Sequence, residues 1–185
     1  LVHFAISNRD VHMSTRLLGP ATQFLPFNLG DAGGAGNPPY AKGHRTHYLW
    51  EQVWQRDSWL EIIERYLVTV RDEKKKIKTI IFPRYHQLDA TRRLVQSVLA
   101  DGPGSKYLIQ HSAGSGKTNS IAWTGHFLSD LHDAQNNKVF SSVLVVSDRD
   151  VLPAGGRLLW YIDPVAAIEW LEKAFGFERR LVVDD

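Results

Sequence analysis

Apolar and polar residues alternate at the start of the chain, which is the pattern of a strand with one buried face. Apolar residues or threonine occupy every second position from Val2 to Ile6 and again from Val11 to Leu17. The polar run Ser7–Asp10 separates these two segments. Because two such segments joined by a short polar turn pair with each other, we predict a β-hairpin. The glycine- and proline-rich residues 31–39 are then predicted to form a loop.

The spacing of apolar residues becomes helical in the next part of the chain. Residues 48–55 and the segment that begins at Ser58 place apolar side chains three or four positions apart. Ser58 and Glu61 have the spacing of a capping box, so we predict that the second helix begins at Ser58. Three tryptophans lie in these segments and are predicted to pack in the core rather than to stack on nucleic-acid bases: Trp50, Trp54 and Trp59.

Helical and strand-like patterns alternate from about residue 79 onward. A helix with its apolar stripe at Leu88, Val95 and Leu99 is predicted to end before the Gly-Pro-Gly run at 102–104. Short apolar runs follow at 107–109 and 142–147, as expected of buried parallel strands. A second helical stripe lies between them, formed by Ile121, Gly125, Leu128 and His132. This order predicts an α/β fold.

A glycine-rich loop lies between the first apolar run and the second helix. His111-Ser-Ala-Gly-Ser-Gly-Lys-Thr118 meets the phosphate-loop pattern G-x-x-x-x-G-K-[ST] from Gly114 on, with His111 in place of the first glycine. A chance surface turn is the alternative, but the strand–loop–helix context argues against it. In such loops, backbone N–H groups surround a polyphosphate, the lysine reaches the β- and γ-phosphates, and the hydroxyl ligates Mg²⁺. The predicted ATP and Mg²⁺ site comprises Ala113, Gly114, Ser115, Gly116, Lys117 and Thr118, with Thr118 as the ligand of the metal.

A second short motif, Arg84-Tyr-His-Gln87, precedes this loop by about one helix. A glutamine amide both donates and accepts, as it does toward the edge of adenine in DNA. Gln87 is therefore predicted to recognise adenine together with Arg84 of the same motif, which favours ATP over GTP as the ligand.

Composition narrows the chemistry further. The chain has no cysteine, which excludes disulfides, thiolate metal sites and thiol nucleophiles. No segment approaches the roughly 20 apolar residues of a membrane span, so we expect no membrane association and a cytoplasmic location. The net charge of +2 is only mildly favourable for binding DNA. The basic run Lys74–Lys78 is interpreted as a solvated linker rather than as a phosphate-contacting strip.

These motifs resemble superfamily 2 helicases, in which Arg84–Gln87 corresponds to the Q-tip motif and Val143–Leu152 to motif Ia. The resemblance is closer to the restriction (R) subunit of type I restriction–modification enzymes, over about residues 1–152. In that family a histidine at the first P-loop position is normal. The matching segments are 15–28, 33–39, 48–59, 82–90, 107–123 and 143–152.

The resemblance implies a fold, an activity and partners. The expected fold is α/β, a partial RecA-like P-loop lobe at 79–152 preceded by the end of a nuclease domain at 1–47 and a helical linker at 48–78. The family is an ATP-dependent DNA translocase and endonuclease that acts on double-stranded DNA with modification and specificity subunits. Asp148 and Arg149 lie in the turn of motif Ia, which faces DNA in the superfamily.

The same resemblance implies that catalytic groups are missing from this chain. The nuclease Asp, Glu and Lys are expected upstream of Leu1, and the second acidic motif that orients water for hydrolysis is expected well beyond motif Ia. Leu181–Asp185 imitates that motif but is interpreted as chance. We therefore expect a fragment that is an ATP-dependent hydrolase by family, binds ATP, has no catalytic residue of its own and is inactive alone.

Residues 153–185 depart from this family. From about residue 156 they resemble the first strand–helix–strand unit of the vicinal oxygen chelate family, which includes glyoxalases, and no metal ligand of that family can be assigned. The join suggests a gene fusion, a rearranged pseudogene or a frame artefact. Two alternatives stay open: an interaction or pseudogene remnant without nucleotide chemistry, and a metal-dependent enzyme of the oxygen-chelate type.

Overall fold

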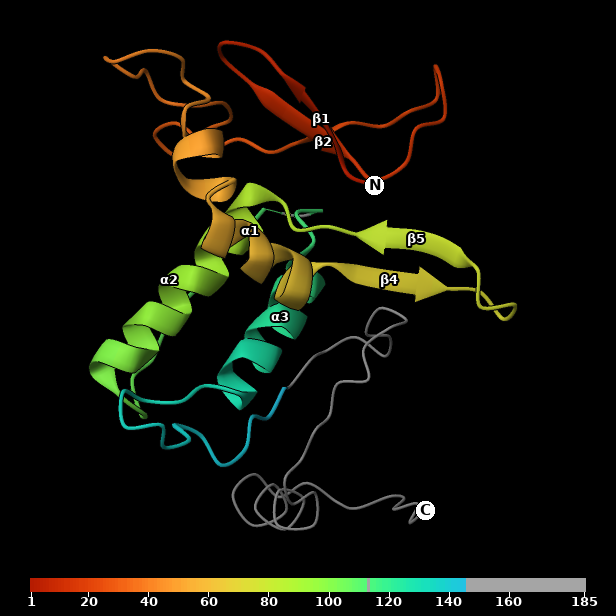
Figure 1. Cartoon of the computed structure of the whole chain (residues 1–185). Coiled ribbons are helices and arrows are strands. Elements are labelled where there is room, and N and C mark those ends of the chain that lie inside the picture. Colours follow the sequence, from red (N-terminus) through yellow and green to blue (C-terminus); the bar gives the residue numbers. More distant parts are fainter. Residues whose placement is uncertain (113, 146–185) are drawn as a thin grey trace.

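The computed structural model describes residues 1–112 and 114–145 (Figure 1). Several predictions lie outside these residues: Ala113 of the glycine-rich loop, the motif Ia turn with Asp148 and Arg149, and the oxygen-chelate-like segment 153–185. The described part is mixed α/β, with two small antiparallel sheets and two long helices.

The first sheet contains the predicted hairpin. Strands β1 (His3–Ile6) and β2 (Val11–Ser14) pair antiparallel, and β3 (Leu25–Pro26) pairs with β2 on its other side. The hairpin prediction is therefore confirmed, with Ser7 Oγ accepting the Asp10 N–H at 2.9 Å in the turn. The glycine- and proline-rich loop at 31–39 is anchored by the buried Asn37, whose amide donates to Arg9 O at 2.8 Å.

The predicted helical linker contains three short helical turns and then a strand. These turns are η1 (Leu49–Val53), α1 (Arg56–Glu61) and η2 (Ile62–Tyr66), of which η1 and η2 are π-helical. The capping-box prediction at Ser58 is wrong, because α1 begins two residues earlier. Ser58 Oγ instead accepts Arg92 Nη2–H at 2.9 Å, so a contact with a later helix outweighs the local cap.

A second hairpin projects from the body of the molecule (Figure 1). Strands β4 (Val68–Arg71) and β5 (Ile77–Ile81) pair antiparallel, and the basic run 74–78 spans the tip and the start of β5. The polar stretch between the two halves of the sequence is thus the end of a hairpin.

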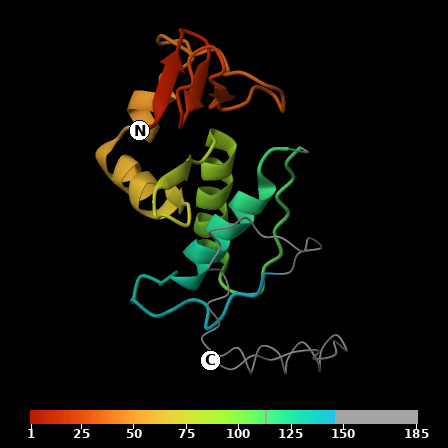
Figure 2. The same ribbon diagram turned by 90° about the vertical axis from the view of Figure 1, so that its right-hand side faces the viewer.

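Two helices lie side by side below the first sheet (Figures 1 and 2). Helix α2 (Tyr85–Asp101) and helix α3 (Lys117–Ser129) confirm the two predicted helices, and α2 ends at Gly102 with a φ of 75°. None of the helices in the described ranges is long and apolar enough to cross a membrane.

The parallel strands predicted on either side of the loop are not formed in the described residues. Residues 105–112 and 142–145 are irregular, and Leu108 is 90% exposed. An apolar run becomes a strand only when a neighbouring backbone accepts its hydrogen bonds, and no such partner lies along either segment within 1–112 and 114–145. The strand prediction was therefore wrong for residues 107–109, because periodicity detects apolar character and not pairing, and the predicted run 142–147 lies partly outside the described residues.

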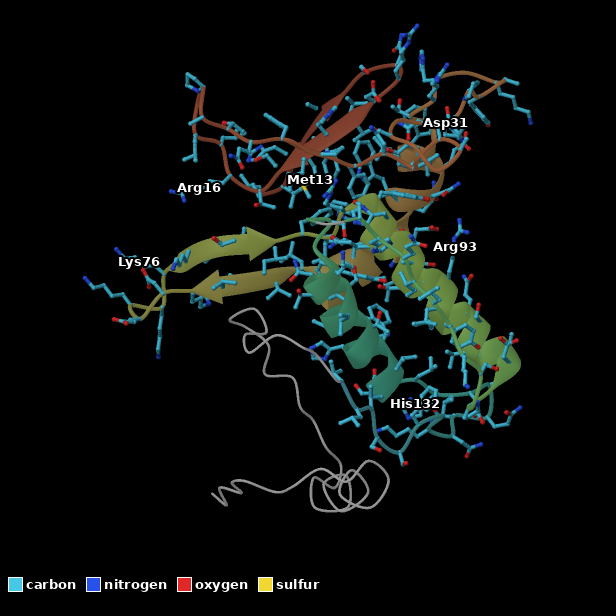
Figure 3. The ribbon with its side chains drawn as sticks, turned by 180° about the vertical axis from the view of Figure 1, so that it is seen from behind. Met13, Arg16, Asp31, Lys76, Arg93 and His132 are labelled. Carbon is cyan, nitrogen blue, oxygen red and sulfur yellow. The ribbon has the colours of Figure 1, made fainter. Side chains whose placement is uncertain are left out.

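Within the described residues, an aromatic-rich core joins the first sheet to the helices. Phe4 meets Phe82 edge-on with ring centroids 6.0 Å apart, and Phe27 meets Tyr85 at 5.8 Å. Figure 3 shows Met13 on β2 between the sheet and the helices, where it is almost fully buried. The core consists of Val11, Met13, Phe27, Tyr48, Leu49, Val53, Ile62, Tyr66, Phe82, Leu88, Trp123 and Phe127. The position of the N-terminal segment relative to the glycine-rich loop is thus set by shared packing.

The predicted packing role of the three tryptophans is only partly met. Trp59 packs against Phe82 with centroids 6.1 Å apart, and Trp54 meets Phe4 at 5.6 Å although its side chain stays partly exposed. Trp50 is 43% exposed and lies outside the core cluster.

Candidate phosphate-binding site

The glycine-rich loop leads directly into α3, whose first residue is Lys117. Gly114 and Gly116 have φ values of 73° and 81°, a left-handed conformation that glycine adopts without strain. The Lys117 ammonium folds back over the loop and donates to the carbonyls of His111 at 3.1 Å and Ser112 at 2.9 Å. A helix N-terminus and a lysine are thus directed at one loop, an arrangement that favours an anion.

Gln87 holds this loop to the start of α2. Its Nε2 donates to Ser115 O at 3.2 Å and Gly116 O at 2.9 Å, while its Oε1 accepts the Arg84 N–H at 2.8 Å. The side chain is 3% exposed. Both N–H donors are therefore occupied, and one lone pair of Oε1 is left for any other partner. The predicted adenine contact of Gln87 is limited to that lone pair in this arrangement.

Two imidazoles lie beside the loop. His86 Nε2 donates to Ser115 O at 3.1 Å, and its ring meets that of His111 with centroids 4.8 Å apart. Burial lowers the pKa of His86, against the opposing effect of the Ser115 carbonyl. Burial and the Lys117 ammonium lower the pKa of His111. The lowered pKa values favour the neutral form of both rings, so the positive charge beside the loop comes from Lys117 and Arg84.

A cavity of about 620 Å³ opens between the first sheet and the loop, and we name it the sheet-side cavity. It is lined by Met13, Ser14, Thr15, Arg16, Leu18, Ala21, Gln23, Leu25, Ile80, Ile81, Phe82, Arg84, Gln87, Gly114, Ser115, Gly116 and Asn119. No carboxylate lies among these residues, and neither Arg16 nor Arg84 forms an ion pair within 1–112 and 114–145. The cavity is therefore suited to a ligand that carries negative charge.

Two polar atoms at this cavity are buried without a partner. Ser115 Oγ and Arg84 Nε make no hydrogen bond in the described part of the chain. A buried polar atom left unpaired costs free energy that a bound ligand can recover. Both atoms fit the predicted nucleotide, so the residues of the site match the group that the loop motif implies.

A second, apolar opening of about 380 Å³ lies on the other side of α3, and we name it the apolar groove. The predicted stripe Ile121, Gly125 and Leu128 faces this groove. The side of α3 that enters the core carries Trp123 and Phe127 instead. The predicted stripe is thus confirmed on the helix for these three residues, whereas its fourth predicted member, His132, lies beyond the end of α3 at Ser129. Other lining residues include Ile109, His111, Lys117, Ser120, Thr124 and Val143 to Val145.

The described residues hold no preformed metal centre. No group of three His, Cys, Asp or Glu side chains gathers in 1–112 and 114–145. Thr118, on the first turn of α3, is the predicted Mg²⁺ ligand. A metal here would have to arrive with the phosphates, because one hydroxyl is too few ligands for Mg²⁺.

Sequence reasoning missed the part of the cavity wall that comes from residues 13–25. Arg16 and Gln23 belong to this wall, yet they lie about 90 positions before the loop. No local pattern marks them, because only the fold brings them near the loop.

Comparison with known proteins gives one informative similarity. The chain is 33% identical over 86 residues to the "Putative type I restriction enzyme MjaVIIP endonuclease subunit" of Methanocaldococcus jannaschii. This match covers 44% of the chain and only 8% of the length of that relative. No protein-family model and no solved structure matches the chain. The chain thus resembles part of an endonuclease subunit of a type I restriction enzyme.

Proposed function

We propose that the glycine-rich loop binds Mg-ATP and that the chain is a fragment of the ATP-dependent DNA translocase and endonuclease subunit of a type I restriction system. The observation that carries the nucleotide part is the loop itself. Lys117 begins α3 and points back over left-handed glycines, which is a geometry made for phosphate. The resemblance of the sequence and the restriction-enzyme relative support the larger assignment.

The triphosphate would replace contacts that the loop now makes with itself. Lys117 would exchange the carbonyls of His111 and Ser112 for phosphate oxygens, and the first N–H groups of α3 would donate to them. The hydroxyl of Thr118 would hold the Mg²⁺ that accompanies the phosphates. Gln87 would act by keeping the loop in position through Ser115 O and Gly116 O.

We propose binding without turnover for the described residues. Hydrolysis requires an acidic group that holds Mg²⁺ and a residue that orients the attacking water. No Asp or Glu lines either the sheet-side cavity or the apolar groove. The nucleotide would therefore stay intact in the site.

The partners follow from the same assignment. A type I restriction subunit would meet double-stranded DNA together with modification and specificity subunits, as the family resemblance implies. Asp148 and Arg149 are the proposed DNA contacts of motif Ia.

Nucleotide-dependent stability tests the binding proposal. Mg-ATP at a hundred times its Kd should raise the free energy of unfolding of the full chain by about 2.7 kcal/mol, measured by denaturant titration. The Lys117→Ala variant should lose this gain. Lys106→Ala serves as the matched control, because it removes an exposed lysine outside both openings. No gain in the unmodified chain, or an equal gain in Lys117→Ala, would refute the proposal.

An interaction role without nucleotide chemistry is the second candidate. Leu108, Ile109 and Ile121 leave apolar surface exposed close to the apolar groove, with exposed fractions of 90%, 40% and 43%. Surface of this kind favours a protein partner. If Mg-ATP does not raise the free energy of unfolding of the chain, the interaction role would be favoured over nucleotide binding.

A further inference from the structure

The wall of the sheet-side cavity that faces the loop comes from the N-terminal part of the chain. Residues 13–25 run from β2 to β3 and supply eight of the seventeen cavity residues, including Arg16 and Gln23. In Figure 3, Arg16 lies on this segment, on the side of the molecule where the β4–β5 hairpin projects. The segment is itself anchored, since Leu18 N–H donates to Thr22 Oγ1 at 2.7 Å and Met13 is buried in the core.

The cavity lies at the end of the site where a nucleoside would emerge from the loop. Its loop residues are Gly114, Ser115 and Gly116, and its α3 residue is Asn119, which follows the phosphate-binding Lys117 and Thr118. Lys117 itself lines the apolar groove and not this cavity. A triphosphate on the loop would therefore leave the sheet-side cavity for the attached base and sugar.

Gln87 has little capacity left to recognise that base. Its two N–H donors bind Ser115 O and Gly116 O, and its oxygen accepts the Arg84 N–H. A bidentate contact with adenine needs one donor and one acceptor on the same amide. Gln23 offers both, because it is an exposed residue of the same cavity lining and its amide makes no hydrogen bond within 1–112 and 114–145.

We infer that the segment 13–25 closes the nucleoside end of the nucleotide site, with Gln23 contacting the base edge and Arg16 donating to the nucleoside. This inference rests on the proposed binding of ATP to the loop. Base recognition would then come from a segment that, by the family resemblance, belongs to the nuclease-like region. The absence of carboxylates among the lining residues leaves the Arg16 guanidinium available for acceptor atoms of the ligand.

Binding of two ligands distinguishes the contribution of the loop from that of the segment 13–25. Isothermal titration of the full chain with Mg-ATP and with inorganic Mg-triphosphate measures the site with and without the nucleoside. Gln23→Ala and Arg16→Ala should each weaken ATP binding about tenfold, the effect of losing a good base contact, and leave triphosphate binding unchanged. Gln23→Ala should also reduce the preference for ATP over GTP. Lys117→Ala should weaken both ligands.

Arg9→Ala is the matched control. Arg9 lies in the turn of the β1–β2 hairpin, is exposed and does not line the cavity, so its loss should change neither affinity. Unchanged ATP binding in Gln23→Ala and Arg16→Ala, with ATP still bound by the unmodified chain, would overturn the inference alone. Equal losses for ATP and triphosphate would overturn it too, because they would place both residues at the phosphates. Failure of the unmodified chain to bind either ligand would instead overturn the proposed function.

Discussion

The two sides of α3 present opposite chemistry around one loop. The sheet-side cavity contains two arginines, several amides and hydroxyls, and buried polar atoms without partners at Ser115 and Arg84. The apolar groove is lined mainly by aliphatic side chains from α3 and from residues 143–145. Polar atoms of the sheet-side cavity lack hydrogen-bond partners among the described residues, whereas aliphatic side chains of the apolar groove lack apolar neighbours.

This difference separates a ligand site from a packing site. Unpaired polar atoms recover their lost hydrogen bonds only from a polar ligand or water, so the chemistry of the sheet-side cavity favours a polar ligand. Exposed aliphatic surface gains free energy from any apolar cover. The two openings therefore predict different responses to mutation, although both border residues of the same loop.

The largest expected effect contrasts the two faces of α3. Trp123 is buried and its Nε1–H donates to Tyr66 O at 2.9 Å. Trp123→Ala should lower the free energy of unfolding by about 3–5 kcal/mol. Ile121→Ala, on the groove face, should lower it by no more than about 0.5 kcal/mol. Denaturant titration measures both, and equal losses would show that the groove is covered as well as the core.

The next effect compares two glycines of the loop. Gly116→Ala would place a Cβ 2.6 Å from Gln87 Nε2, whereas a Cβ at Gly114 meets nothing within 4 Å. Both changes strain a left-handed φ by about 1–2 kcal/mol. Gly116→Ala should cost roughly 1 kcal/mol more, because it displaces the Gln87 hydrogen bonds.

Mg-ATP titration extends this comparison. Gly116→Ala should weaken ATP binding more than Gly114→Ala, since it also releases the loop from α2. Equal binding by the two variants would show that Gln87 does not position the loop.

A smaller effect concerns pH. The pKa values of His86 and His111 are lowered by burial in the folded chain, relative to an ordinary value of 6.5. The unfolded chain therefore binds more protons, and stability that is complete above pH 6.5 should decline as the pH falls below it. The double variant His86→Asn and His111→Asn should flatten this decline in denaturant titrations over that range. An unchanged slope would place its origin in other groups.

The smallest expected effect on stability is that of a change in the apolar groove, which should instead alter self-association of the chain. Ile109→Ser, in the apolar groove, should change the free energy of unfolding by less than about 0.5 kcal/mol and reduce light scattering of the concentrated chain. Ile77→Ser is the control, because Ile77 is 57% exposed on β5 and lies outside the groove. Equal reductions of light scattering in both variants would show that the apolar groove is not the cause of the association.

Local patterns predicted the parts of the fold that depend on nearby residues. The β1–β2 hairpin and the helices α2 and α3 follow from spacing and from turn residues such as Gly102. The glycine-rich loop was recognised for the same reason, because its residues are contiguous. The predicted RecA-like lobe depends on long-range strand pairing, and it stays a prediction.

The errors arose where distant contacts decided the outcome. The hydroxyl of Ser58 accepts a hydrogen bond from Arg92 on α2 and does not cap its own helix. The same guanidinium pairs with Glu61. The amide of Gln87 also binds distant backbone, at Ser115 O and Gly116 O, and its predicted contact with adenine stays a prediction. Arg16 and Gln23 gave no signal, because a cavity wall is a property of the fold and not of a segment.

The hydrogen bonds of Gln87 bear on how fast the loop can accept a ligand. Since α2 already holds Ser115 and Gly116 in place, little backbone has to be ordered when a ligand arrives. Among the loop residues that the structure describes, the Lys117 side chain must leave its carbonyls, and exposed side chains rotate in picoseconds to nanoseconds. Association of a ligand should therefore be limited by diffusion into the cavity. Mutations around the loop should then change the dissociation rate of the ligand more than its association rate.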